Sequence, residues 1–343
     1  MMQIVKVEEA IGLPLAHDIT EIRPGEFKGP AFHRGYVVKD YDVDHLRRLG
    51  KDHLYILKTE LNQLHEDDAV REIANALCGD GVAWEGLPRE GKLALKATRD
   101  GLLKVDVDVL TGFNKLGEVM CATRHTDSLV IKGDKVAATR AIPLLIDRSV
   151  IIAAVEIAKQ SQGVLRVLPI KKANVGVLIT GNEVYHGRIQ DRFEPVIRKK
   201  VEALQGTILD VVFLPDDDDR IATAALDLVK RGADVLITTG GMSVDPDDRT
   251  RFGLLRAGAR DMLYGAAVLP GAMFMIAQLK DVPVLGIPAC GMHAIATVFD
   301  LIYPRVLAGE RMTRNDIARL GHGGMCLQCE ACRYPNCPFG KAS

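Results

Sequence analysis

The second half of the chain alternates short apolar runs with amphipathic segments. The runs are rich in β-branched residues and predict buried strands over residues 175–180, 211–215, 235–239 and 282–288. The segments between them place apolar residues three or four positions apart and predict helices over residues 194–205, 219–231 and 293–307. We expect Gly206 to end the first helix, and Ile295, Phe299 and Ile302 to face inward from the last. The alternation predicts an α/β domain over residues 172–310, with a mostly parallel sheet and helices on both faces.

Residues 1–171 show a different pattern, which predicts a smaller, β-rich α+β module. Residues 92–114 alternate apolar and polar positions around an Arg-Asp-Gly turn and predict a β-hairpin. Amphipathic spacing predicts helices near residues 42–49, 61–78 and 149–162, with Gly79 ending the second. Residues 311–343 form a third part, a short cysteine-rich tail.

The segment from Val235 to Asp248 joins a buried strand to a loop rich in glycine and acids. Glycine lets the backbone approach a ligand closely, and the outward amides of such a turn attract anions. The segment therefore predicts a binding loop for a phosphorylated small molecule. A plain strand-to-helix turn with solubilising acids is the alternative.

Acidic residues follow the ends of three predicted strands. Glu183 follows the first, Asp216 and Asp217 the second, and Asp248 the third. Ligands in parallel sheets bind beyond the carboxyl ends of the strands, so we expect these carboxylates to converge beside the glycine-rich loop. They would repel a phosphate unless a cation lay between, and Mg²⁺ prefers oxygen ligands. The alternative for residues 216–219 is that they cap the following helix, where acids are favoured.

Together these loops resemble the molybdopterin-binding domain shared by molybdopterin adenylyltransferases and molybdopterin molybdotransferases. The matching positions are Thr180, Gly181 and Glu183, Asp216 and Asp217, Thr239, Gly240, Gly241, Ser243 and Asp248, Pro270 and Gly271, and residues 285–288. The resemblance implies that molybdopterin, or its adenylylated form, is the ligand. It also implies a Mg²⁺-dependent step in the maturation of molybdenum or tungsten cofactor.

The resemblance also implies roles for individual residues. Those expected to hold the pterin and its phosphate are Thr180, Gly181, Thr239, Gly240, Gly241, Ser243, Pro270, Gly271 and Pro288. Glu183, Asp216 and Asp248 are expected to position Mg²⁺ for cleavage of the adenylate, coupled to insertion of molybdate or tungstate.

The chain departs from the family pattern at two loops. Asn182 stands where the family has aspartate, and residues 289–291, Ala-Cys-Gly, replace a Gly-Asn-Pro turn. Cys290 is expected to be a packing residue. Residues 10–20, 29–38 and 112–120 resemble the molybdotransferase branch, but residues 64–110 show no counterpart of its inserted domain. The alternative to an enzyme is therefore a non-catalytic cofactor carrier or sensor that docks onto a molybdoenzyme, and a generic nucleotide-binding protein is a third reading.

Four of the seven cysteines crowd the tail: Cys326, Cys329, Cys332 and Cys337. The CxxCxxC run, followed after four residues by Cys-Pro, is close to the ferredoxin pattern and predicts a metal site. Zinc sites more often pair two CxxC knuckles across a longer loop, so a [4Fe–4S] cluster is favoured over tetrahedral zinc. Cysteines without metal in an unstructured tail are the remaining alternative.

Charge and hydropathy exclude several classes of partner. Lys and Arg (44) nearly balance Asp and Glu (45), so no global field recruits nucleic acid or an anionic membrane. The N-terminus lacks a signal-peptide pattern, and the apolar stretch from Ala266 to Leu279 falls short of the roughly 20 residues that cross a bilayer. We expect a cytoplasmic homo-oligomer, in which crowded cysteines indicate metal rather than disulfides.

Overall fold

The computed structural model describes residues 3–56, 62–242, 245 and 248–341. The chain divides into two compact units. Unit 1 comprises Met1–Arg99, Lys104–Arg124 and Ile131–Val167, and unit 2 comprises Asp100–Leu103, His125–Val130 and Leu168–Ser343. Every residue of the expected site belongs to unit 2. None of the described helices is long and apolar enough to cross a membrane.

Unit 2 is built on a six-stranded sheet with the order β15-β14-β16-β19-β18-β17. The strands are β14 (Asn174–Thr180), β15 (Thr207–Leu214), β16 (Val235–Thr239), β17 (Arg260–Tyr264), β18 (Met275–Leu279) and β19 (Val282–Ile287). The first four strands in this order are parallel, while β18 and β17 are antiparallel to their neighbours. The prediction of an α/β sheet is confirmed, but the antiparallel edge was not expected.

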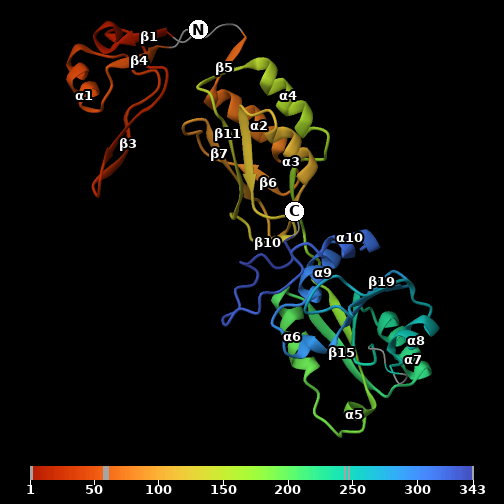
Figure 1. Ribbon diagram of the computed structural model, residues 1–343. Coiled ribbons are helices and arrows are strands. Elements are labelled where there is room, and N and C mark those ends of the chain that lie inside the picture. The colour runs from red at the N-terminus through yellow and green to blue at the C-terminus, as the bar shows by residue number, and fades with distance from the viewer. Residues whose placement is uncertain (1–2, 57–61, 243–244, 246–247, 342–343) are drawn as a thin grey trace. The chain divides into compact units, whose positions relative to one another are not determined.

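Helices cover both faces of this sheet (Figure 1). The helical elements are α5 (Asn182–Tyr185), α6 (Phe193–Ala203), α7 (Asp218–Lys230), α8 (Thr250–Arg256), η3 (Ala289–Met292), α9 (Val298–Leu307) and α10 (Arg314–Arg319). Val177 and Ile179 of β14 pack in one core with residues of α6 and α9, whereas Leu178 packs in a second core with residues of α7 and α8. Successive side chains of a strand point to opposite faces, so a wholly apolar strand can supply both cores.

Two helix ends differ from the sequence expectation. Helix α9 begins at Val298 because Thr297 and Asp300 form a capping box. The Thr297 hydroxyl accepts a hydrogen bond from the backbone of the first turn, and the Asp300 carboxylate accepts one from the N–H of Thr297. Ile295 precedes the helix and is 71% exposed, so its inward placement is wrong, whereas Phe299 and Ile302 are buried as expected. After α6, the residue with left-handed backbone is Gln205 (φ +59°) and not Gly206.

Unit 1 contains short strands and four helices among its described residues. Its elements are β1 (Gln3–Lys6), η1 (Val7–Ala10), β2 (Ile19–Arg23), β3 (Phe27–Phe32), η2 (Asp40–Asp42), α1 (Val43–Arg48), β4 (His53–Ile56), β5 (Gln63–His65), α2 (Glu66–Leu77), β6 (Val82–Trp84), β7 (Lys92–Ala97), α3 (Val107–Asn114), β9 (Val119–Thr123), β11 (Lys135–Ala141), β12 (Leu145–Asp147), α4 (Arg148–Ala158) and β13 (Leu165–Leu168), which ends one residue into unit 2. Its largest sheet has the order β6-β7-β11-β9. The helices expected near residues 42–49 and 149–162 correspond to α1 and α4.

The hairpin predicted over residues 92–114 is wrong. Strand β7 pairs with β6 and β11, whereas β8 (Gly101–Val105) pairs with β10 (Ser128–Val130). The rest of the segment, from Val107, is helix α3, begun by the Asp106 side chain, which accepts a hydrogen bond from Val109 N. The alternating pattern therefore identified two strands but not their partners, which lie far along the chain.

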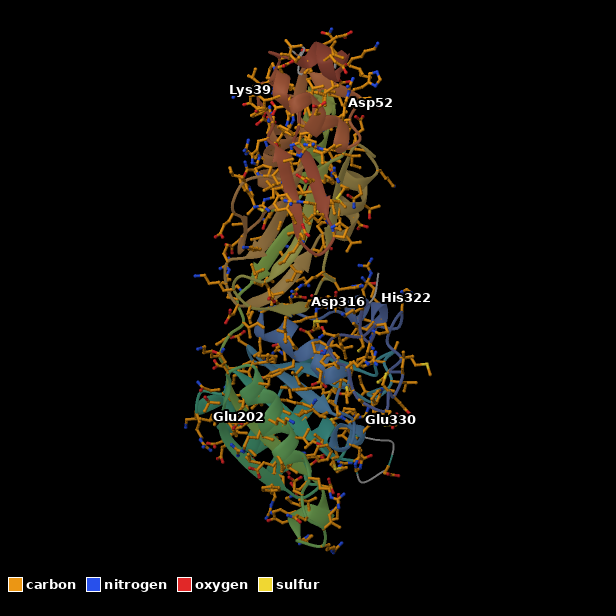
Figure 2. The ribbon with its side chains drawn as sticks, turned by 90° about the vertical axis from the view of Figure 1, so that its left-hand side faces the viewer. Lys39, Asp52, Glu202, Asp316, His322 and Glu330 are labelled. Atoms are coloured by element: carbon orange, nitrogen blue, oxygen red, sulfur yellow. The ribbon has the colours of Figure 1, made fainter. Side chains whose placement is uncertain are left out.

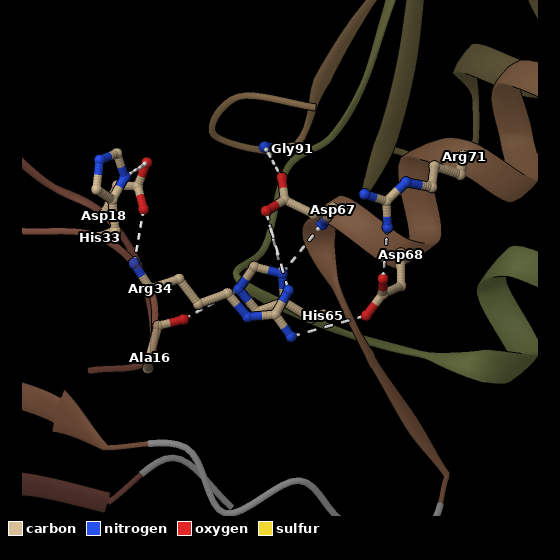
Figure 3. Close-up of polar contacts among 9 residues, drawn as sticks. All are labelled: Ala16, Asp18, His33, Arg34, His65, Asp67, Asp68, Arg71 and Gly91. Atoms are coloured by element: carbon tan, nitrogen blue, oxygen red, sulfur yellow. Dashed lines mark hydrogen bonds and ion pairs between the residues drawn. The ribbon is translucent and has the colours of Figure 1, made fainter. Parts of the chain in front are cut away.

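The helix predicted over residues 61–78 begins later, at Glu66. His65 ends strand β5 and caps the helix, because its Nδ1 accepts a hydrogen bond from Asp67 N at 3.1 Å (Figure 3). The Nε2 of the same ring lies 3.0 Å from the carbonyl oxygen of Ala16, and Arg34 pairs with Asp67 and Asp68. These contacts join residues 16–34 to the start of α2 within unit 1. Residue 61 lies outside the described residues.

Candidate functional site

The carboxyl ends of the four parallel strands lie side by side. Thr180 at the end of β14 is level with Leu214 of β15, and Ile179 is level with Thr239 of β16, which pairs in turn with Ile287 of β19. The loops that follow these strands therefore start from one edge of the sheet. This is the edge at which α/β sheets bind their ligands.

Thr180 links the ends of β14 and β16. Its Oγ1 donates to the carbonyl oxygen of Thr239 at 3.1 Å and lies 2.7 Å from Oγ1 of Thr250. Thr250, the first residue of α8, donates its hydroxyl to the carbonyl oxygen of Gly240 at 3.1 Å and its N–H to that of Gly241. Thr180 and Thr250 are both buried. Buried hydroxyls thus hold the glycine-rich turn against the neighbouring strand.

Gly240 and Gly241 occupy positions that only glycine fits. Their φ angles are +83° and +49°, in the region that side-chain-bearing residues rarely adopt. A Cβ on Gly240 would lie 2.0 Å from the carbonyl oxygen of Thr180, and one on Gly241 would lie 2.5 Å from Oγ1 of Thr250. The hydroxyl of Thr239 is fully buried and has no hydrogen-bond partner among the described residues. The turn therefore presents closely packed backbone at the strand ends.

Asp216 is the carboxylate that the structure brings to this turn. Its Oδ2 accepts a hydrogen bond from Asn182 N at 2.9 Å, and its own N–H donates to Oδ1 of Asn182 at 3.3 Å. Its Oδ1 would lie 3.3 Å from a Cβ on Gly241. Asn182, the position that departs from the family pattern, thus bridges the loops after β14 and β15.

Of the next three aspartates, Asp217 caps helix α7, as the capping alternative anticipated, and the other two pair with arginines at the two ends of α8. Oδ1 of Asp217 accepts a hydrogen bond from Arg220 N at 2.9 Å and caps the helix. Asp218 makes two bonds to Arg249, at 2.9 and 2.5 Å, and Asp219 pairs with Arg256 at 2.5 Å. The match of Asp217 to the family pattern therefore coincides with a structural role.

Glu183 lies in the short helix α5 and Asp248 in the loop before α8, and neither forms a ready-made cluster with Asp216 in the described residues. Oδ2 of Asp248 accepts a hydrogen bond from Asp245 N at 3.1 Å. The Glu183 carboxylate lies close to Gly181, because a Cβ added to Gly181 would be 2.8 Å from Oε1 of Glu183. In the described part of the chain, no three His, Cys, Asp or Glu side chains are grouped so as to hold a metal ion. Ser243, expected to bind the phosphate, lies outside the described residues.

Pro270 and Gly271 lie beside the tail. A Cβ on Gly271 would be 2.6 Å from Cγ1 of Val298 at the start of α9. Leu269, just before Pro270, forms a parallel bridge with Met325, with hydrogen bonds of 2.8 Å from Leu269 N to Gly324 O and from Cys326 N to Leu269 O. Pro288 precedes η3, the turn that follows β19. These loops therefore meet the cysteine run.

The tail encloses a cavity of about 590 Å³. Its lining includes Pro270, Cys290, His293, Cys326, Cys329, Cys332, Arg333 and Cys337. Cys329 and Cys332 are exposed, whereas Cys290, Cys326 and Cys337 are partly buried, and burial raises the pKa of the Cys290 thiol. Glu330 marks this loop in Figure 2, and His322, also labelled there, is not among the cavity's lining residues.

Thr250, Arg249 and Tyr264 were not anticipated from the sequence. The hydroxyl of Tyr264 donates to the carbonyl oxygen of Met242 at 2.6 Å and so ties β17 to the glycine-rich loop. Residues 249–250 directly follow the acidic run. Thr250 can hold the glycine-rich turn only because the start of α8 lies against the end of β14, and no local sequence pattern reveals that contact.

Comparisons with known proteins agree with the strand-end motifs. Residues 176–308 match the family described as a probable molybdopterin binding domain, and residues 4–58 match a domain of unknown function (DUF8806). A stretch of 160 residues is 28% identical to the molybdopterin molybdenumtransferase of Haemophilus influenzae and covers 44% of this chain and 39% of that protein. A stretch of 95 residues is 34% identical to a CinA-like protein of Syntrophus aciditrophicus, covering 28% of this chain and 22% of that protein.

Among solved structures, the tungsten cofactor synthesizing protein MoaB from Pyrococcus furiosus is similar to part of the chain. It is 18% identical, with a TM-score of 0.31, and the match covers 41% of this chain and 99% of that one. The chain matches less than half the length of the two curated relatives above.

Proposed function

Since residues 176–308 carry a domain of the molybdopterin-binding family, we propose that the strand-end edge of unit 2 binds the phosphate of molybdopterin or of its adenylylated form. The observation that carries the proposal is the turn at Gly240 and Gly241, where glycine backbone is held by Thr180 and Thr250. Successive backbone N–H groups in such a turn form a concave site for anions. The buried Thr239 hydroxyl adds a further polar group at the same strand end.

Asp216 would hold a Mg²⁺ ion, which would offset the charge of the ligand phosphates. Mg²⁺ keeps several water ligands and is commonly bound by one or two carboxylates together with substrate phosphates. A preformed group of three acidic side chains is therefore not required. Asn182 N–H orients Asp216 through Oδ2. Glu183 in α5 and Asp248 in the loop before α8 are the additional carboxylates that ligand binding would draw toward the ion.

We infer that the reaction is cleavage of adenylylated molybdopterin coupled to molybdate or tungstate insertion. Water attacks the adenylyl phosphorus, the bond from that phosphorus to the bridging oxygen breaks, and AMP leaves with the oxygen of water. The bridging oxygen stays on the pterin phosphate, and the protons of water pass to solvent. Mg²⁺ would offset the charge that develops on the phosphate oxygens. This chain's own contribution is to orient the phosphates on the glycine turn and to position the ion through Asp216.

The test incubates the full chain with adenylylated molybdopterin, Mg²⁺ and molybdate, and measures AMP release and pterin binding. Asp216→Asn and Asp248→Asn are expected to reduce AMP release at least about tenfold, as loss of a charge-stabilising group does. Asp227→Asn is the matched control, because Asp227 is an exposed aspartate on α7 that pairs with Arg231. Absence of both pterin binding and AMP release from the wild-type protein would overturn the proposal.

We further infer that the tail cysteines hold a metal, as a [4Fe–4S] cluster or as zinc. All four line one cavity, which accords with ligands recruited to a common centre. They are not drawn together as a single-ion site in the described residues, so metal binding would complete their arrangement. Metal analysis of anaerobically purified protein tests this: zinc or iron bound in stoichiometric amount supports it, and metal-free protein after reconstitution with both contradicts it.

A further inference from the structure

We infer that the tail cavity holds a [4Fe–4S] cluster and that this cluster packs against the turn after β19 through Cys290 and His293. This rests on the proposed metal site of the four tail cysteines and adds the identity of the metal and its contact with the pterin-binding domain. The lining comes from the tail, from residues 290–296 and from Pro270, which lie apart in the sequence. The cavity therefore spans the tail and η3.

The cysteine spacing of the tail favours a cluster over one ion, and the cavity has room for a cluster. A single zinc ion draws four sulfur atoms to about 2.3 Å from its centre, so the sulfurs nearly touch one another. In a cubane cluster each thiolate binds a different iron, and the ligands lie around a larger body. Here five thiols line a half-open cavity of about 590 Å³, and because no three of the described donor side chains are grouped around one point, loading must draw the tail cysteines together.

The tail is closed at its base and leaves apolar side chains exposed on the cavity wall. Gly340 N donates to Gly323 O at 2.9 Å, and a Cβ on Gly340 would collide with Leu301 of α9, so the loop's ends are fixed. Phe339 is buried, yet Leu327 and Ile295 on the cavity wall are 69% and 71% exposed. A group that fills the cavity would cover part of these apolar side chains.

Charge at the cavity suits a thiolate cluster. Arg333 lies in the lining beside Cys332, and its guanidinium would offset the negative charge of the coordinated sulfurs. Tyr334 fixes the same stretch to α9, since its hydroxyl donates to the carbonyl oxygen of Asp300 at 3.1 Å. The cysteine run is therefore anchored on the helix that follows η3.

Contact with η3 gives the cluster an effect on the domain. The turn from Ala289 to Thr297 is short, lies between β19 and α9, and exposes His293 and Ile295. When the cluster fills the cavity, it packs against Cys290 and His293. Local opening of the turn must then break this contact, so the turn should open less often. Local opening is the quantity that amide hydrogen exchange measures.

The experiment uses the full chain, purified without oxygen and reconstituted with ferrous iron and sulfide. We expect about four irons and four sulfides per chain with visible absorbance, as for a Cys-ligated [4Fe–4S] centre. Amide hydrogen exchange in residues 289–297 should slow at least about fivefold when the cluster is loaded, which is the low end of the usual coupling between two sites. Exchange in α2 of unit 1 serves as the internal reference and should not change.

Three variants make the assignment specific. Cys332→Ser removes an exposed thiol, so it should lose the cluster and the slowed exchange without unfolding, which circular dichroism checks. Cys78→Ala, in unit 1, should retain both. Cys290→Ala should keep the iron content and lose most of the slowing; loss of the cluster itself would make Cys290 a ligand and overturn the tail-only ligand set.

The outcomes separate the two proposals. A protein that binds neither iron nor zinc refutes the tail metal site, and this inference with it. Tight zinc binding without a cluster leaves the metal site standing and overturns the inference. A loaded cluster with unchanged exchange in residues 289–297 also overturns it, because the contact with η3 would then be absent.

Discussion

Replacing Gly240 by alanine tests whether the turn after β16 must lie against β14. Two effects add at this position. Alanine at φ +83° costs about 1–2 kcal/mol in the left-handed region. A Cβ 2.0 Å from the carbonyl oxygen of Thr180 must also move away, and that movement breaks the 3.1 Å bonds from Thr180 to Thr239 and from Thr250 to Gly240. Each buried bond contributes about 1 kcal/mol, so we expect a total of about 3–4 kcal/mol.

Gly232→Ala is the matched control. Gly232 follows α7 in the same unit with φ +96°, and nothing lies within 4 Å of its added Cβ. It therefore measures the backbone strain alone, about 1–2 kcal/mol. The difference between the two variants reports the collision with Thr180.

The assay is urea unfolding followed by two probes. The single tryptophan, Trp84, lies in unit 1, so its fluorescence follows that unit, whereas far-ultraviolet circular dichroism follows both. Gly240→Ala should shift the circular dichroism transition and leave the fluorescence transition in place. If Gly240→Ala and Gly232→Ala agreed within about 0.5 kcal/mol, the usual scatter of neutral surface changes, the close approach of the two strands would be refuted.

Three further substitutions test other parts of the chain. Glu66 is 7% exposed, and burial raises its pKa to about 7, so the folded chain keeps a proton on Glu66 that the unfolded chain releases near pH 4.5. The free energy of unfolding should therefore fall by about 3 kcal/mol, relative to that of Glu66→Gln, as the pH rises from 4.5 to 7, and should stay level above pH 7. Equal pH profiles of the two proteins in urea titrations would contradict this. Thr180→Val should lower the free energy of unfolding of unit 2 by about 1–3 kcal/mol because it leaves buried partners unpaired, while Thr180→Ser should recover most of it. Thr297→Ala should cost about 1 kcal/mol through loss of the α9 cap, measured by thermal unfolding, whereas Thr223→Ala, on exposed α7 surface, should cost less.

The strands of unit 2 and their chemistry-bearing loops could be predicted because the signal is local. Buried parallel strands are nearly continuous apolar runs, and the change to glycine and acid marks where each one ends. Thr180, Asp216 and Gly240 were therefore found at the correct edge of the sheet. The start of α9 was equally local: Thr297 followed by Asp300 carries a capping signal that places Ile295 outside the helix.

Pairing between distant segments could not be read in the same way. Strands β7 and β8 are separated by a short turn, yet each pairs with a partner outside the predicted hairpin. The role of Thr250 likewise depends on α8 returning to the end of β14. Such contacts depend on the whole topology, and side-chain alternation along one strand is the same whichever strand lies beside it.

The two unusual features of the α/β sequence meet in one place. By the resemblance drawn from the sequence, residues 289–291 stand in place of a Gly-Asn-Pro turn, and the cysteine run lies beyond the domain match, which ends at residue 308. Cys290 from the first and Cys326 from the second line the same cavity, with Pro270 between the sheet and the tail. In that alignment Cys290 takes the place of the asparagine and Gly291 that of the proline, and Cys290 lines the cavity beside the tail. The altered turn and the added cysteines are therefore best explained as parts of one arrangement, in which the loop that the family resemblance assigns to the pterin also forms a wall of the proposed cluster site.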